Sequence, residues 1–180
     1  MKLYAESTLP LRADAVFCHA RDELHEIGSF MPDVSYVQPV LRISGLDAFE
    51  RVDRLGARVA PLRVAGRSFS EARWLLHSSW HEPSTSARWQ VEVEHPADAL
   101  QCDGTISIME DDAGEARVRI SGRVRLRLEM LGLRLLGPTF AGGVERLIAS
   151  RIESNLRSLF DAMAPAAGGR GTGFARVALP

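Results

Sequence analysis

The segment EARVRISGRVRLRLE, residues 115–129, alternates between two chemistries at every position. In an extended chain, one side would carry Ala116, Val118, Ile120, Gly122, Val124, Leu126 and Leu128. The other side would carry Arg117, Arg119, Ser121, Arg123, Arg125 and Arg127. A repeat of two residues is the period of a β-strand. We therefore predict a long antiparallel strand with one dry face and one wet face.

A long amphipathic helix is predicted shortly after this strand, over residues 139–164. Its apolar residues recur at steps of three and four, namely Phe140, Val144, Leu147, Ile148, Ile152, Leu156, Leu159, Phe160 and Met163. This spacing places them on one face of a helix. Pro138 and Thr139 mark its start and Pro165 marks its end. The helix is the natural cover for the dry face of the strand.

The rest of the sequence predicts a mostly antiparallel α+β fold. Strands are expected at residues 2–8, 34–43, 48–59, 69–81, 87–95 and 100–110, with a helical segment at 15–30 and a link between strands through Gly66. Pro39 indicates an edge strand or a bulge. Such a sheet cannot bury its dry face alone, so it should curl around the final helix. We predict a single domain over residues 1–164 and a flexible Gly- and Ala-rich tail over 165–180.

Composition places the chain among ordinary globular proteins. Of its 180 residues, 46% are hydrophobic and 25% are charged, with a formal net charge of −1. This balance excludes extensive disorder and gives no global attraction to nucleic acid. No apolar stretch follows the first residues, MKLYAESTLP, and we predict a cytoplasmic bacterial protein. Cys18 and Cys102 are far apart and outside any metal-binding spacing, so free thiols are expected.

Three segments resemble a known superfamily. LPLRADAVFCHARDELHEIGSFMPDVSYVQPVLRISG, GTISIMEDDAGEARVRISGRV and VERLIASRIESNLRSLF are similar to the opening, the paired final strands and the closing helix of SRPBCC proteins. In the first segment the likeness rests on Phe17, Asp22, Phe30, Met31, Pro32, Val34 and Val37. It is closest to bacterial polyketide cyclase/dehydrase and coenzyme Q-binding START-domain proteins. The resemblance implies a helix-grip fold, in which a seven-stranded antiparallel sheet curls around a C-terminal helix. It also implies short helices after the first strand and a hydrophobic cavity between sheet and C-terminal helix.

The tryptophans are the first candidates for the wall of that cavity. Trp74 and Trp80 share one face of their strand, and Trp89 shares a face of the next strand with His95. Aromatic side chains there would suit a flat or polycyclic ligand. The alternative is that they fill a solid core. Trp80 is also close enough to the following turn to lie at the rim.

Two polar helix residues are further candidates. Asn155 lies within the apolar stripe, and a buried amide costs about 1–3 kcal/mol unless water, backbone or a ligand satisfies it. Arg151 is expected at the cavity mouth, where it would hold a carboxylate, phosphate or phenolate. The predicted ligand-binding residues are Trp74, Trp80, Trp89, His95, Phe140, Val144, Ile148, Arg151 and Asn155.

The sequence contains no recognisable catalytic signature. His77 and His81 would lie roughly 13 Å apart on a strand, so we predict no metal site, and nothing indicates a cofactor. A polyketide cyclase would need a proton donor or acceptor beside its substrate. The candidates for that role are Tyr36, His95, Arg151 and Asn155, with Asp33 near Tyr36 as a further option.

These observations support three hypotheses. The first is binding or transport of a hydrophobic small molecule, such as a lipid, quinone or polyketide-like compound, between the sheet and the C-terminal helix. The second is a polyketide aromatase/cyclase that uses the same cavity. The third is a protein-interaction module without a small ligand, and for it the arginine row would have to bind a partner. Glu6, Glu92, Glu94 and Asp103 could instead pair with that row across strands. We expect no DNA partner and at most transient membrane contact, and no protein partner is indicated.

Overall fold

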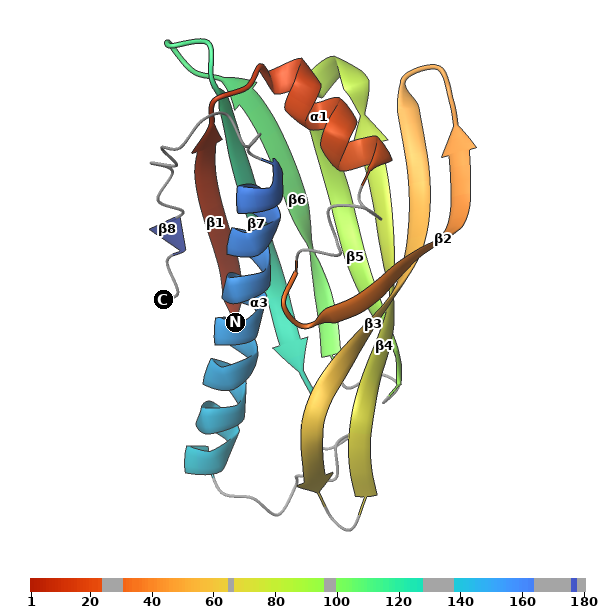
Figure 1. Ribbon diagram of the computed structural model, residues 1–180, viewed down its shortest axis with the longest axis vertical. Helices are drawn as coiled ribbons and strands as arrows, with labels where there is room; N and C mark the ends of the chain where they lie inside the picture. Colours follow the sequence, from red (N-terminus) through yellow and green to blue (C-terminus); the bar gives the residue numbers. More distant parts are fainter. Residues whose placement is uncertain (24–30, 65–66, 96–99, 128–137, 164–175, 178–180) are drawn as a thin grey trace.

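The computed structural model describes residues 1–23, 31–64, 67–95, 100–127, 138–163 and 176–177. This described part contains a sheet of seven long antiparallel strands, two α-helices and a short 3-10 turn (Figure 1). The elements are β1 (Lys2–Leu9), α1 (Ala13–Asp22), β2 (Val34–Ser44), β3 (Ala48–Val64), β4 (Arg67–His81), η2 (Glu82–Ser84), β5 (Ser86–His95), β6 (Leu100–Glu110), β7 (Ala116–Leu126) and α3 (Pro138–Met163). A two-residue strand, β8 (Arg176–Val177), adds to the edge at β1. The helix-grip prediction is therefore confirmed, while the predicted helical residues 24–30 lie outside the described part.

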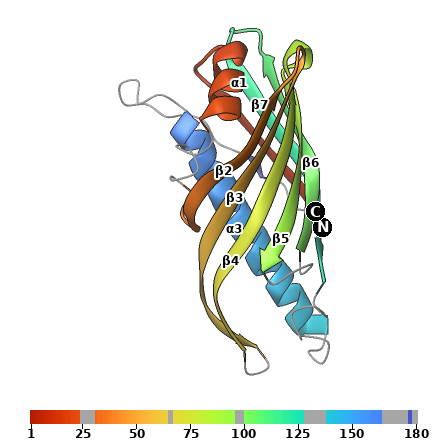
Figure 2. The same ribbon diagram turned by 90° about the vertical axis from the view of Figure 1, so that its right-hand side faces the viewer.

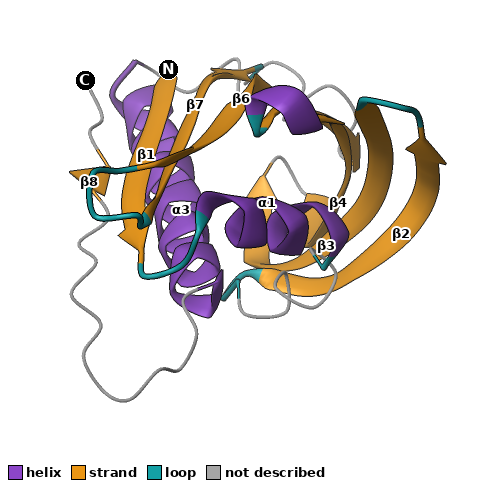
Figure 3. Ribbon diagram, turned by 90° about the horizontal axis from the view of Figure 1, so that it is seen from above, coloured by secondary structure: helices purple, strands orange, loops and turns teal. Residues whose placement is uncertain are grey.

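The strands follow the order β2-β3-β4-β5-β6-β7-β1-β8, so the first long strand closes the sheet beside the last one. Figure 2 shows α3 crossing the concave side of the sheet, and Figure 3 shows how the sheet curls from β2 round to β1. We call this concave side the inner face and the opposite side the outer face. The layers thus leave the inner face covered by helices and the outer face open.

Strand β7 has one buried face and one largely exposed face, as predicted from its alternating sequence. In β7, Ala116, Val118, Ile120 and Val124 are buried, whereas Arg117, Arg123 and Arg125 are exposed. Ile152 and Leu156 of α3 pack against a buried cluster of Leu3, Cys102 and Val124. Phe160 lies in a second buried cluster with Phe17, Trp80 and Ile108. The dry face of β7 therefore belongs to a core that includes α3.

Two prolines show how the backbone adapts. Pro39 lies in the edge strand β2, where the pairing with β3 shifts register between Pro39 and Leu41, as predicted for an edge or a bulge. The predicted link after residue 59 is wrong, because β3 continues to Val64 and β4 begins at Arg67. Pro61 lies within the shifted register between Arg58 and Leu62. A bulge tolerates a residue that cannot donate a backbone hydrogen bond, so the strand pair continues past it.

The two cysteines are free thiols, Cys18 exposed and Cys102 buried. Burial raises the pKa of the Cys102 thiol to about 12. Among the described residues, no helix is both long and apolar enough to cross a membrane.

Candidate functional site

Buried aromatic side chains pack together at the end of the inner face near α1. The rings of Phe17 and Trp80 meet edge to face, with centroids 5.4 Å apart. Both side chains are buried, and Trp80 donates a hydrogen bond from Nε1 to Ser78 Oγ at 3.0 Å. Trp80 therefore packs in the core, and it also lines the pocket between α1 and the β2–β3 turn that is described below.

The middle of the inner face is packed differently. Trp74 and Leu76 on β4 and Val91 and Val93 on β5 share the inner face, in the register Trp74↔Val93 and Leu76↔Val91. All four are only partly buried, although they point inward. Ile148 on α3 is also half-buried. These inward-facing apolar side chains therefore keep part of their surface accessible on the concave side of the sheet.

Trp89 separates these two regions. Its indole lies over Gly104 of β6 and Gly122 of β7, which are paired in register. A Cβ at Gly104 would lie 2.6 Å from Trp89 Cζ2, and one at Gly122 would lie 2.7 Å from the same atom. Because these two residues have no side chain, the indole can lie directly on the backbone there. We call this contact surface of Gly104 and Gly122 the seat of Trp89. Trp89 is mainly a packing residue, although its Nε1 is buried without a hydrogen-bond partner in the described part of the molecule.

A buried ion pair lies on β3 at the same level. Arg51 is 1% exposed and Asp53 is 0% exposed. Arg51 Nε lies 2.5 Å from Asp53 Oδ2. Both residues share the inner face with Phe49 and Leu55, because β3 pairs Phe49 with Trp80 and Leu55 with Trp74.

Arg51 also holds the end of α1. Its Nη1 donates to the backbone oxygens of Arg21 at 2.7 Å and Asp22 at 3.2 Å, both in the last turn of the helix. A cation at a helix C-terminus is favourable, because the last carbonyls lack helical partners and carry partial negative charge. Within the described part, however, Arg51 Nη2 and Asp53 Oδ1 have no hydrogen-bond partner. The end of α1 therefore uses only some of the hydrogen-bonding groups of Arg51 and Asp53.

Neither Arg51 nor Asp53 is among the site residues predicted from the sequence. Phe49 and Leu55 are apolar at alternate positions, and Arg51 and Asp53 fall at the same parity between them. Extending that alternation through the two charged residues would have placed both on the inner face. The charges concealed the pattern, since charged residues are rarely buried unless paired.

Two of the four predicted catalytic candidates meet at Asp33. Arg151 Nη1 donates to Asp33 Oδ1 at 2.8 Å, and Asn155 Nδ2 donates to Asp33 Oδ2 at 3.2 Å. The backbone N–H of Asp33 donates to Asn155 Oδ1, also at 3.2 Å. The amide of Asn155 is thus satisfied by the protein itself. These bonds tie α3 to the turn that precedes β2.

A pocket of about 330 Å³ adjoins this cluster, and Pro32, Asp33, Val34 and Ser35 line it. The side chain of Arg151 is 62% exposed. Asp33 belongs both to the lining of this pocket and to the cluster with Arg151.

Tyr36 lies on the other side of the sheet. Its ring covers Gly56, because a Cβ at Gly56 would fall within 3 Å of three Tyr36 ring carbons. Gly56 pairs with Arg73 on the exposed outer face. A register shift between Val34 and Tyr36 changes which face the following side chains take. The structure therefore separates Tyr36 from Arg151 and Asn155. The side chains of His95, Phe140 and Val144 lie outside the described part.

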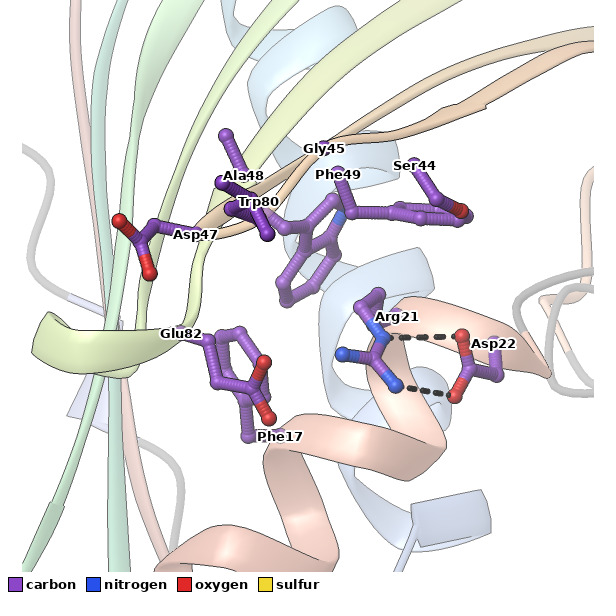
Figure 4. Close-up of a pocket in the computed structure, with 11 residues that line it drawn as sticks. Phe17, Arg21, Asp22, Ser44, Gly45, Asp47, Ala48, Phe49, Trp80 and Glu82 are labelled. Atoms are coloured by element: carbon purple, nitrogen blue, oxygen red, sulfur yellow. Dashed lines mark hydrogen bonds and ion pairs between the residues drawn. The ribbon is translucent and has the colours of Figure 1, made fainter.

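A second pocket, of about 220 Å³, opens between α1 and the β2–β3 turn (Figure 4). Arg21 lies 5.7 Å from the Phe17 ring centroid and 5.6 Å from that of Phe49. Its guanidinium also bonds both carboxylate oxygens of Asp22, at 2.9 and 2.8 Å. These bonds lower the pKa of Asp22 and raise that of Arg21. Within this pocket, the charges of Arg21 and Asp22 therefore satisfy each other.

The outer face carries a lattice of charges. Glu6 accepts a hydrogen bond from Tyr4, lies 3.3 Å from Arg119 Nε and lies 3.7 Å from Arg117 Nε. Glu92 and Glu94 share this face but pair with His77 and Arg54 respectively. Part of the arginine row is therefore neutralised across strands, as one reading of the sequence predicted. Among the described residues, no three His, Cys, Asp or Glu side chains gather closely enough to hold a metal ion.

Solved structures of other proteins resemble this chain in fold, although their sequences differ from it widely. No family model matches the chain, and no curated protein matches it either. A protein from Thermus thermophilus has a TM-score of 0.67 at 19% identity, over 93% of this chain and 100% of that one. The Zhui aromatase/cyclase from Streptomyces sp. R1128 has a TM-score of 0.60 at 15% identity, over 94% and 100% of the two chains.

A third solved structure is a STAR-related lipid transfer protein from Xanthomonas axonopodis. It has a TM-score of 0.57 at 15% identity, and the match covers 90% of this chain and 85% of that one. The chain has an SRPBCC-type fold. The likeness to these three solved structures covers 90–94% of the chain, so it is a likeness of the overall fold. A shared fold at this level of identity does not identify a ligand or a reaction.

Proposed function

We propose that this protein binds a hydrophobic small molecule between the inner face of its sheet and α3. The observation that carries the proposal is the set of half-buried, inward-facing side chains Trp74, Leu76, Val91 and Val93. Ligand sites are typically concave and mostly apolar, with a few fixed polar groups. Here the apolar groups border the polar groups of Arg51 and Asp53.

The ligand class is a lipid, a quinone or a polyketide-like compound. Support for a flat or polycyclic ligand comes from the partly exposed indole of Trp74 on the inner face. Proteins of the same fold include a lipid transfer protein and an aromatase/cyclase. A carrier of such a molecule in the cytoplasm is the simplest role that fits these features.

Native mass spectrometry of gently purified protein tests this proposal. We expect an additional mass from an apolar compound that co-purifies with the wild-type chain. Val93→Trp should abolish it, because the larger side chain fills the space on the inner face. Gln90→Trp is the matched control, since Gln90 lies exposed on the outer face of the same strand. Equal ligand occupancy in both variants, or an empty wild-type protein that also takes up no apolar probe, would reject the proposal.

An aromatase/cyclase activity is the second candidate function. The meeting of Asp33, Arg151 and Asn155 beside a pocket favours it, because a cyclase needs groups that move protons near the bound substrate. Asp33 would act as base and Arg151 would stabilise a developing oxyanion. Asn155→Ala and Arg151→Met should then change the products formed from a poly-β-ketone. Unchanged products in both variants would leave ligand binding as the function.

A further inference from the structure

The two edges of the sheet are covered differently. Strand β1 is followed by β8, whereas no described strand lies beyond β2 (Figure 3). An open edge presents a row of unpaired backbone N–H and C=O groups, so natural proteins usually protect it with charges, prolines or bulges. In β2 the proline and the bulge lie together, at Pro39 and the register shift before Leu41. The part of the strand after the bulge pairs regularly with β3 and is open on its other side.

This open part of β2 is apolar. Of the seven large hydrophobic residues that are exposed in the described part of the chain, four lie within residues 40–46. They are Val40, Leu41, Ile43 and Leu46. Within β2 the only charged residue is Arg42, and its Nη2 donates to the backbone oxygen of Asp22 at 3.2 Å. The charge of Arg42 is therefore directed toward the end of α1 and leaves the edge unprotected.

The hydrogen bond at the β2–β3 turn determines which backbone groups are free. The N–H of Gly45 donates to the backbone oxygen of Ala48 at 2.7 Å. Because hydrogen-bonded positions alternate along an antiparallel strand, the odd-numbered residues 41 and 43 also direct their backbone groups toward β3. Arg42 and Ser44 therefore direct theirs toward the open edge. A partner strand would have to bond to these two residues.

A second copy of β2 fits this edge in an antiparallel register with a twofold axis at Ile43. In that register Arg42 of one copy lies opposite Ser44 of the other, and the two residues exchange both backbone hydrogen bonds. Ile43 faces its own counterpart at a position without backbone hydrogen bonds, where side chains lie closest. Leu41 lies opposite Gly45, which has no side chain to obstruct it. The register thus satisfies the free backbone groups and covers the exposed apolar side chains.

The neighbouring registers are less favourable. An axis at Arg42 would place two positive charges directly opposite each other, which is destabilising. An axis at Leu41 would bring Pro39 and the bulge into the pairing, and proline has no N–H to donate. We infer that this protein forms a symmetric dimer through residues 41–45, in which the two sheets join at β2. The contact uses the edge and the outer face, so it does not depend on the proposed ligand.

Sedimentation velocity over a series of protein concentrations tests the inference. One pair of strands is a small interface, so we expect a weak dimer with a dissociation constant of roughly 10–100 μM. Ile43→Lys places two like charges on the axis and should raise this constant by more than about tenfold. Leu147→Lys is the matched control, because Leu147 is 55% exposed on α3 and Ile43 is 50% exposed on β2. It should dimerise as the wild type does.

Two results would overturn the inference. One is a wild-type protein that stays monomeric over this range, including one that binds phospholipid vesicles through the same edge instead. The other is a dimer that Ile43→Lys leaves unchanged. Circular dichroism of Ile43→Lys checks that the variant is folded, as expected for a change at an exposed position.

A cross-link locates the axis without a charged substitution. In a Cys18→Ser background, Ile43→Cys should form a disulfide-linked dimer under mild oxidation. Facing residues without backbone hydrogen bonds have Cα atoms about 4.5 Å apart, which suits a disulfide. Leu147→Cys in the same background is the control and should remain a free thiol, and Cys102 is buried in both proteins. Equal rates of cross-linking for the two variants would contradict the register.

Discussion

Glu6 organises the charges at the edge of the outer face, where β1 lies beside β7. It accepts a hydrogen bond from Tyr4 and lies between Arg117 and Arg119. The hydrogen bond from Tyr4 is the largest cause that lowers the pKa of Glu6, followed by the contact with Arg119. The side chain of Glu6 is 27% exposed, so solvent screens these interactions only in part.

We predict that Glu6→Gln lowers the melting temperature at pH 7 by a few degrees. Because the folded pKa of Glu6 lies below its unfolded value near 4.5, its stabilisation is complete above that value. It is lost as the pH falls through the folded pKa. Thermal melts of both proteins from pH 7 down to acidic pH should therefore converge at the acid end. A difference that stays constant across this range would show that Glu6 acts through packing rather than through its charge.

At the scale of single residues, the alternation of side chains along a strand predicted their face of the sheet correctly where strands are regular. Beside a bulge the same rule failed. The inward positions of Trp74 and Trp89 and the outward arginines of β7 followed from alternation alone. Tyr36 did not, because the register shift beside it reverses the face of the side chain. The partnership of Asn155 with Asp33 joins residues 122 positions apart, and no local pattern encodes such a contact.

At the scale of elements, β5, β6 and β7 are joined by the seat of Trp89. Gly104 and Gly122 face each other across β6 and β7, and the indole lies over both. A Cβ at Gly122 would also approach the backbone oxygen of Asp103 at 2.6 Å. Backbone atoms cannot move aside as a flexible side chain can, so this seat requires glycine.

Gly122→Ala should therefore destabilise the fold by about 1–3 kcal/mol, the usual cost of overpacking a core. For a chain of this size, each kcal/mol lowers the melting temperature by about 2–4 °C. Gly142→Ala is the control, because no atom lies within 4 Å of a Cβ built there in α3. It should be neutral or stabilising by up to about 1 kcal/mol, since alanine favours a helix over glycine. Equal melting temperatures for the two variants would contradict the assigned seat.

The boundaries of the elements followed from sequence to different degrees. The amphipathic repeat located α3 to within one residue at each end. The end of β3 was missed by five residues, because Pro61 suggested a break while the bulge between Arg58 and Leu62 absorbs it. Local signals thus identify elements well and overstate the effect of a single proline.

At the scale of the whole molecule, the order of elements was sufficient to predict the fold. The apolar face of the two-faced strand and the apolar face of the amphipathic helix can be buried against each other. The remaining strands must then form a curled sheet around that pair. The contact of the buried Arg51 with the end of α1 joins residues 30 positions apart in the chain, and no local pattern of the sequence displays it. The proposed function therefore requires that a ligand lies on the half-buried part of the inner face.

Methyl NMR of the protein titrated with 2-naphthol tests that claim most directly. The account predicts that the methyl signals of Leu76, Val91 and Val93 shift with the probe. The methyl signals of Leu41 and Val52, which pair on the outer face, should remain in place. Shifts confined to the outer face, or no shifts at saturating probe, would contradict a ligand site between the sheet and α3.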